Sequence, residues 1–325
     1  MTDTKEISKS PKLSDEQKKL AMAKNIRAAL PIVGLVFIFI LFNILTKGGM
    51  VSGLSLALSQ VYVILIASMG VFFIMTMGGL DFSQGSIMGL ASIAVCMASK
   101  SMSVPMAILC GILTGAVIGS INGFFHVVLK IKSFIVTICT MFLFRGLIKF
   151  LTSKAPVGGA AKLMDYDTMQ LKLGVTIAVL IVGFVAFNFT RFGIDLKAIG
   201  AGELAAKFAG IRTDRMKFLI YVLSGAITGF AAFINVIKVG SVTSSGGNQL
   251  ETQILIALVL GGMPISGGAK VRFMNIIVGS LLYIVLSSGL RIMGLDTQTM
   301  QLIQGIVFLV FVAVFADRQS IQVIK

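Results

Sequence analysis

The chain has 325 residues, of which 56% are hydrophobic and 13% are charged, and its mean hydropathy is +0.97. Because a soluble domain carries about 25% charged residues, this composition excludes an ordinary soluble protein and predicts one transmembrane domain with no soluble domain. The formal net charge of +15 does not indicate a nucleic-acid partner, because the basic residues flank apolar segments and are not interleaved with stacking aromatic side chains.

Segments without Asp, Glu, Lys or Arg mark the candidate membrane spans, each of which needs about 20 mostly apolar residues. Backbone polar groups must be paired inside lipid, and no barrel-like alternation is present, so each segment is predicted to be a helix. The sequence therefore predicts an all-α polytopic membrane protein with about ten transmembrane helices. The predicted spans are 28–46, 48–80, 82–99, 101–129, a stretch near 133–152 that Arg145 and Lys149 interrupt, 173–190, 218–237, 252–269, 273–290 and 297–316.

The distribution of Lys and Arg predicts the orientation of the chain. Nineteen basic residues fall in segments on the N-terminal side of the membrane, and seven fall in the opposite connections. Since cytoplasmic loops collect Lys and Arg, both termini are expected in the cytoplasm. The predicted organisation is a basic cytoplasmic tail at 1–27 without a cleavable-signal pattern, a transmembrane domain at 28–317, and a cytoplasmic tail at 318–325.

One acidic residue lies between two apolar segments, in GGLDFSQGS at 78–86. Asp81 directly precedes an apolar run, and Gln84 follows three residues later, as in a capping box. We therefore expect Asp81 to cap the helix that begins after it, while Gly78 and Gly79 permit a sharp turn. A direct role of Asp81 in gating or permeation is the alternative.

A second glycine-rich stretch, GGMPISGGAK at 261–270, has Gly or Ser at the same offsets as the first. Four such matches in a chain with 35 glycines are compatible with an internal repeat but do not establish one. Pro264 predicts a helix break in this stretch. The candidate helix-break or gating residues are Gly78, Gly79, Asp81, Ser83, Gly261, Gly262 and Pro264.

Two further ionisable residues, Arg145 and Lys149, share one face of a predicted span. Near the middle of the membrane they would mark a hydrated route, and near its edge they would reach the interface. Together with Glu251 they are the candidate residues of a solute path.

No motif in the sequence predicts chemistry by this chain. There is no metal-ligand spacing and no phosphate-binding GxxxxGK[ST] loop, and the single histidine, His126, is expected to be a packed or interfacial residue. The three cysteines are expected to be buried small apolar residues. We therefore expect no enzymatic activity, no metal and no cofactor bound by this chain.

The longest polar connection, 190–217, contains the segment GELAAKFAGI. Leu204, Phe208 and Ile211 recur at helical spacing and would form one apolar face of a short cytoplasmic helix. Such a face either docks on a partner protein or folds back on its own loop.

Several motifs now resemble a known family. They are GGLDFSQGS, NGFF at 122–125, FIVTICTMFLFRGL at 134–147, TRFGIDLKAIGAGELAAKFAGI at 190–211, YVLSGAITGFAA at 221–232 and LVLGGMPISGGA at 258–269. In this order they resemble the ribose- and galactoside-type permease subunits of bacterial ABC importers, over about residues 30 to 317. Departures at Ala201, Gly202, Gln253 and Pro264 leave this architecture in place and weaken any inference about the substrate.

The resemblance implies a multi-pass protein of the bacterial plasma membrane. It would act with a second permease subunit, identical or related, with ATP-binding subunits that carry ATP and Mg²⁺, and with an extracytoplasmic solute-binding protein. A pentose or hexose is the expected solute, with nucleosides, a sugar-derived signal or another polyol as alternatives.

The family's coupling helix corresponds to the 190–217 connection. The residues expected to couple to the ATPase are Ile199, Gly200, Glu203, Leu204, Ala205, Ala206, Phe208, Gly210 and Ile211. An ion-coupled secondary transporter or channel is the alternative class, but such proteins normally need several buried acids, and only Asp81 qualifies from the sequence.

Overall fold

The structure is a computed structural model that describes residues 15–315. The predicted C-terminal tail at 318–325 and the first fourteen residues of the predicted N-terminal tail lie outside the described residues. The elements are α1 (Asp15–Leu45), α2 (Gly49–Ser52), α3 (Leu54–Thr76), α4 (Gln84–Ser101), α5 (Val104–Val127), α6 (Ser133–Leu151), β1 (Val157–Gly158), the 3-10 helix η1 (Ala161–Tyr166), α7 (Met169–Phe189), α8 (Arg191–Ala201), α9 (Glu203–Phe208), α10 (Thr213–Val239), β2 (Ser241–Val242), α11 (Leu250–Leu260), α12 (Met274–Ile292) and α13 (Thr297–Phe315).

The helical, membrane-embedded class predicted from the sequence is confirmed. Among residues 15–315, six helices are long and apolar enough to cross a membrane, namely α3, α5, α6, α7, α10 and α12. The apolar part of α1, Ala29–Leu45, is shorter, as are α11 and the apolar part of α13, Thr297–Ala313. The count of ten spans and the cytoplasmic location of both termini stay predictions.

The centre of the fold is a close contact between α5 and α10. Four glycines of α5, spaced four residues apart at 111, 115, 119 and 123, all face α10. A methyl group on Gly115 would overlap the carbonyl oxygen of Gly225, and one on Gly225 would overlap that of Gly115. This spacing of small residues lets two membrane helices pack backbone against backbone.

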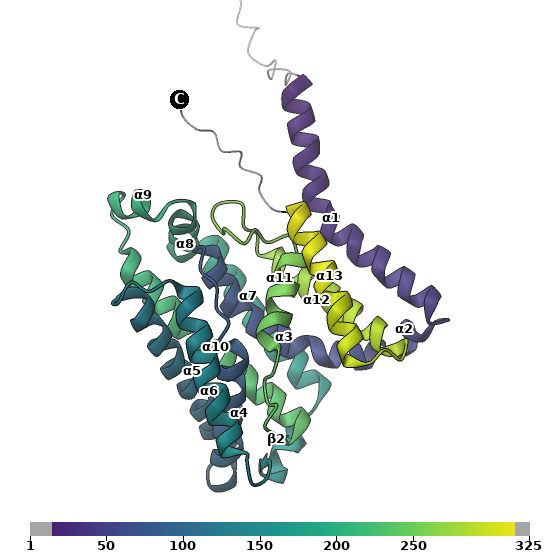
Figure 1. Ribbon diagram of the computed structural model, residues 1–325, viewed down its shortest axis with the longest axis vertical. Helices are drawn as coiled ribbons and strands as arrows, with labels where there is room; N and C mark the ends of the chain where they lie inside the picture. Colours follow the sequence, from purple (N-terminus) through teal and green to yellow (C-terminus); the bar gives the residue numbers. More distant parts are fainter. Residues whose placement is uncertain (1–14, 316–325) are drawn as a thin grey trace, which may run out of the picture.

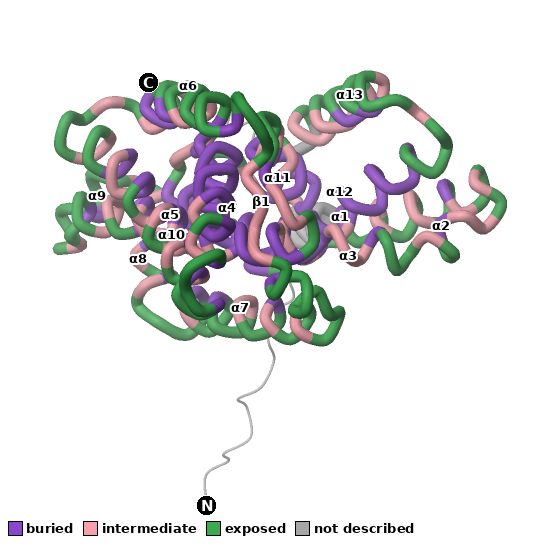
Figure 2. Tube along the Cα trace, turned by 90° about the horizontal axis from the view of Figure 1, so that it is seen from below, coloured by how far each residue is buried: buried purple, intermediate pink, exposed green. Residues whose placement is uncertain are grey.

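Other helices surround this pair. Helices α3 and α4 pack against α10 and are largely buried, whereas α6, α7 and α13 expose apolar side chains on the outside of the chain (Figure 2). Helix α12 packs against α1, α3 and α11. At one end β1 and β2 form an antiparallel pair, with Val157 opposite Val242, and α8 and α9 lie at the other end (Figure 1).

The span predicted at 252–269 is wrong. Helix α11 ends at Leu260 after 11 residues, a length of about 16 Å, which is roughly half of the hydrocarbon thickness. It ends as α3 does, in a turn around a glycine with positive φ, +83° at Gly262 and +81° at Gly78. In each turn the residue after this glycine donates its N–H to a carbonyl five residues earlier, which satisfies an otherwise unpaired group of the helix end.

This shared turn changes the register of the proposed repeat. By sequence offset Gly78 aligned with Gly261, but by conformation it corresponds to Gly262. Gly261 has a different structural role. A methyl group there would overlap the carbonyl oxygen of Asn275, so this glycine allows the end of α11 to pack against α12. We call residues 77–83 the first glycine-rich turn and residues 261–268 the second.

Candidate functional site

The connection predicted to couple to an ATPase contains two helices, α8 and α9. Helix α9 ends at Phe208, so Ile211 lies outside it and packs against the core. The predicted face of three apolar residues is therefore wrong in its last member. Leu204 and Phe208 are 68% and 85% exposed, which leaves a two-residue apolar surface on α9.

The other predicted coupling residues divide by exposure. Ile199 and Ala206 are buried, so they fix α8 and α9 against the rest of the chain and cannot touch a partner directly. Glu203, Ala205 and Gly210 are exposed. Glu203 forms an ion pair with Lys217 and thereby joins α9 to the first turns of α10.

Gly200 on α8 lies where both glycine-rich turns meet. A methyl group there would overlap the carbonyl oxygen of Thr76, at the end of α3, and would lie 2.6 Å from the amide nitrogen of Gly268. The Gly268 N–H donates to the same Thr76 oxygen at 3.0 Å. A displacement of α8 therefore acts directly on the end of α3 and on the second glycine-rich turn.

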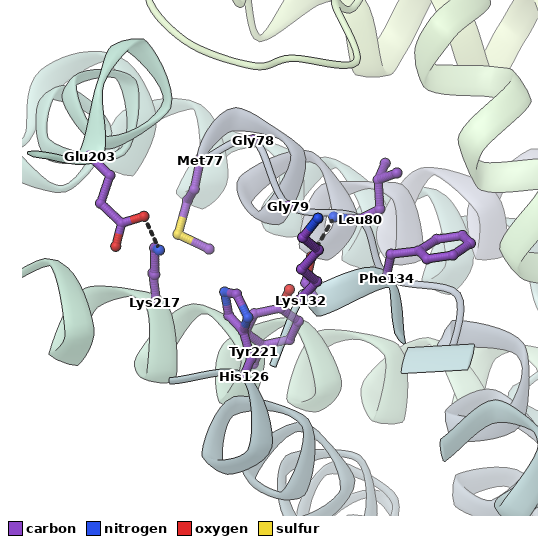
Figure 3. Close-up of a pocket in the computed structure, with 11 residues that line it drawn as sticks. Met77, Gly78, Gly79, Leu80, His126, Lys132, Phe134, Glu203, Lys217 and Tyr221 are labelled. Carbon is purple, nitrogen blue, oxygen red and sulfur yellow. Dashed lines mark hydrogen bonds and ion pairs between the residues drawn. The ribbon is translucent and has the colours of Figure 1, made fainter. Parts of the chain in front are cut away.

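A cavity of about 340 Å³ lies between α9, α10 and the first glycine-rich turn (Figure 3). The Glu203–Lys217 pair stands on one side of it, and His126 and Tyr221, whose rings are 5.5 Å apart, stand on another. The lining residues of the cavity are Met77, Gly78, Gly79, Leu80, His126, Lys132, Ser133, Phe134, Glu203, Lys217 and Tyr221.

Asp81 is not the capping residue that the sequence suggested. Helix α4 begins at Gln84, two residues later than the predicted span, and Asp81 is only 1% exposed. One carboxylate oxygen accepts from the N–H of Ser83 at 2.8 Å and from its hydroxyl at 2.6 Å. The other accepts from Gln84 Nε2 at 2.6 Å, so the carboxylate holds the first glycine-rich turn and the start of α4 together.

The hydrogen bonds of Gln84 extend into α10. Its Nε2 also donates to Ser224 Oγ at 3.1 Å, and its Oε1 accepts from Thr228 Oγ1. Both hydrogens of the amide group are thereby used, and its oxygen is paired. These bonds fix the start of α4 against the middle of α10.

Ser83 carries the same network into two other helices. Asn122 of α5 donates to Ser83 Oγ at 2.8 Å, and Thr140 of α6 donates to Asn122 Oδ1 at 2.7 Å. Sequence reasoning identified Asp81 and Ser83 and missed Asn122 and Thr140, although polar side chains within otherwise apolar spans were a usable signal.

The candidate path residues are partly brought together. Arg145 of α6 and Glu251 of α11 form an ion pair of 2.9 Å, with Glu251 5% exposed, and Lys149 is exposed one turn further along α6. Glu251 Oε2 has no hydrogen-bond partner. Among residues 15–315 no cluster of His, Cys, Asp and Glu is suited to a metal ion.

Comparison with known proteins places this architecture in a family. The model of the family described as "Branched-chain amino acid transport system / permease component" matches residues 53–312. The chain belongs to this family. Its members are transport components, and the chain is accordingly the permease subunit of an ABC importer. It is a multi-pass protein of the inner membrane. These findings confirm the resemblance seen in the sequence.

Individual relatives are similar over most of their length. The chain is 31% identical to the ribose import permease protein of Bacillus subtilis strain 168, over 96% of this chain and 99% of the relative. It is 30% identical to the fructose import permease protein of Rhizobium meliloti, over 88% and 84%. It is 29% identical to the galactose/methyl galactoside import permease protein of Escherichia coli K12, over 80% and 85%. No solved structure matches the chain.

Proposed function

We propose that this chain imports a monosaccharide or a related polyhydroxyl solute, driven by ATP that a separate subunit binds. The relatives that cover most of the chain are named as permeases for ribose, fructose and galactose or methyl galactoside. The family description names branched-chain amino acids, so family membership alone leaves the solute open. The named relatives favour a sugar.

Coupling to the ATPase is proposed to occur through α9. The observation that carries this proposal is the exposure of Leu204 and Phe208 on a short helix whose neighbour α8 contacts the end of α3 and the second glycine-rich turn through Gly200. Binding and hydrolysis of ATP in the partner would move α8 and α9 together. The turns would then shift the ends of α3 and α11 between two arrangements, each favoured by a different nucleotide state.

The other partners follow from this role. A second permease subunit, identical or related, would complete the path, and an extracytoplasmic binding protein would deliver the solute to the end that carries β1 and β2. The ATPase and α9 would then lie in the cytoplasm with both termini. The path residues and the coupling residues named above belong to this proposal.

The docking surface is tested by charge substitution at one position. Phe208→Asp, in a chain that still inserts, should abolish co-purification of the ATPase, because a carboxylate would replace the most exposed apolar side chain of α9. Phe150→Asp is the matched control, since Phe150 is 74% exposed at the far end of α6. Equal recovery of the ATPase with both variants would refute the docking surface.

The solute class is tested by uptake into proteoliposomes that contain the chain, its ATPase and its binding protein. Ribose, fructose and galactose are supplied separately, with ATP inside the vesicles. We expect uptake of at least one sugar that persists when the proton gradient is collapsed. Uptake that needs the gradient instead of ATP would favour the secondary-transporter alternative.

A further inference from the structure

Two non-helical segments enter the helix bundle from opposite ends. The first glycine-rich turn leads from the end of α3 to Gln84, the first residue of α4. Gln84 bonds to Ser224 and Thr228, which lie near the middle of the 27-residue helix α10. Since an α-helix rises 1.5 Å per residue, α4 begins about 16–22 Å from the start of α10, near the middle of a membrane.

The second segment, residues 243–249, leads from β2 to Leu250, the first residue of α11. Its glycines lie against the start of α4: a methyl group on Gly85 would overlap the carbonyl oxygen of Gly247, and one on Gly247 would overlap that of Gly85. Gly246 is similarly close to Gly89. Helix α11 therefore also begins near the midplane, where its first turn meets the first turn of α4; of the two, α11 has a half-membrane length.

Segment 243–249, which runs from the strand end of the fold to this depth, is polar and partly exposed. Thr243, Ser244, Ser245 and Asn248 are exposed, and Gln249 accepts a hydrogen bond of 2.8 Å from Gln301 of α13. Non-helical backbone and exposed polar side chains are not tolerated against lipid tails, where they would lack hydrogen-bond partners. They occur at membrane depth only where protein covers them or where they line water.

Charged groups lie beside this segment. A methyl group on Gly85 would lie within 3.2 Å of Glu251 Oε2, of the Gly247 carbonyl oxygen and of an Arg145 guanidinium nitrogen, so the Arg145–Glu251 pair is adjacent to residues 243–249. The guanidinium side chain is 22% exposed, and Glu251 Oε2 is a buried acceptor without a donor. A carboxylate, a guanidinium and side-chain amides and hydroxyls are groups that hydrogen-bond to sugar hydroxyls.

We infer that these groups form a solute-binding surface on the wall of the translocation path. We call it the midplane face and define it as residues 243–249 with Arg145 and Glu251. Water fills the path beside it, and the solute's hydroxyl groups replace that water during passage. The binding part of this inference rests on the proposed sugar-import function, whereas the presence of water does not.

The test is the reactivity of single cysteines with a membrane-impermeant, water-soluble thiol reagent. Cys96, Cys110 and Cys139 are first replaced by alanine, and Ser245→Cys and Asn248→Cys are then made separately. Val117→Cys is the control, because Val117 is 58% exposed midway along α5, where the surface is apolar. Since the reagent attacks the thiolate, which forms only in water, both midplane cysteines should react at least about tenfold faster than the control.

Protection by solute is then measured in the complete transporter. Ribose, fructose or galactose, whichever is taken up, should slow the labelling of Asn248→Cys and leave the control unchanged. Labelling of both midplane cysteines as slow as that of Val117→Cys would overturn the inference, whatever the solute is. Fast labelling that no transported sugar slows would confirm the water-filled wall and overturn the binding surface.

Discussion

Replacement of Gly115 by alanine tests whether backbone contact holds α5 to α10. The added methyl group would overlap the Gly225 carbonyl oxygen and lie 3.1 Å from the Gly229 Cα, so the helix backbones, which cannot rotate away, must separate. Overpacking of this kind costs about 1–3 kcal/mol. The higher helix preference of alanine offsets about 1 kcal/mol. We expect a net loss of roughly 0–2 kcal/mol, close to 2 because the obstacle is backbone and cannot move aside.

Gly146→Ala is the matched control, because no heavy atom lies within 4 Å of the position that its methyl group would take on α6. There the helix preference acts alone and should stabilise the chain by up to about 1 kcal/mol. Both variants are unfolded by SDS in mixed micelles, with the loss of helical circular dichroism as the readout. If Gly115→Ala proved as stable as Gly146→Ala, the close α5–α10 contact would be refuted.

Three further outcomes are expected. Asp81→Asn places an amide donor opposite either the Gln84 amide or the Ser83 N–H, so we expect a loss of about 1–3 kcal/mol in the same unfolding assay. Wild-type stability would contradict a stabilising role of these bonds. Gly200→Val should leave the ATPase co-purifying but remove most uptake, and full uptake would refute transmission through this contact. A hydrogen bond from the Thr299 hydroxyl lowers the pKa of Asp296. The Asp296 carboxylate should therefore stabilise the first turn of α13 at any pH above its ordinary pKa of 3.8, and this stabilisation should be lost as the pH falls through the lowered pKa. Hydrogen exchange of the amides in that turn measures the effect. Protection that stays unchanged over this pH range would contradict the prediction.

The sequence predicts the apolar segments well because charge is excluded from lipid, and it predicts poorly where they break. The run from 48 to 80 contains α2 and α3, and the run from 252 to 269 outlasts α11 by nine residues. Helices α3 and α11 each end two residues before a glycine with positive φ. In the sequence, however, a glycine is compatible with a helix interior as well as with a helix end. Only the tertiary contacts of the two turns decide between these roles.

In the candidate site, too, local features could be predicted from the sequence and tertiary contacts could not. The position of a short helix near 204–208 could be predicted from local spacing, and the outward direction of Leu204 and Phe208 followed from it. Ile211 could not be placed, because the chain leaves the helix at Ala209 and turns through Gly210, where φ is +88°. The partners of Gln84 on α10 are 140 and 144 residues away in sequence, so no local pattern identifies them.

The single sheet of the described chain has a mechanical consequence. Main-chain hydrogen bonds between β1 and β2 join the linker after α6 to the linker after α10. At the opposite end, the hydrogen bond from the Gly268 N–H to the Thr76 carbonyl oxygen joins the second glycine-rich turn to the end of α3. Rocking of the helices should therefore pivot about the strand pair, with the largest excursions on the side of α8 and α9. Such a lever would turn a small displacement at the strand pair into a larger opening at the end that carries α8 and α9.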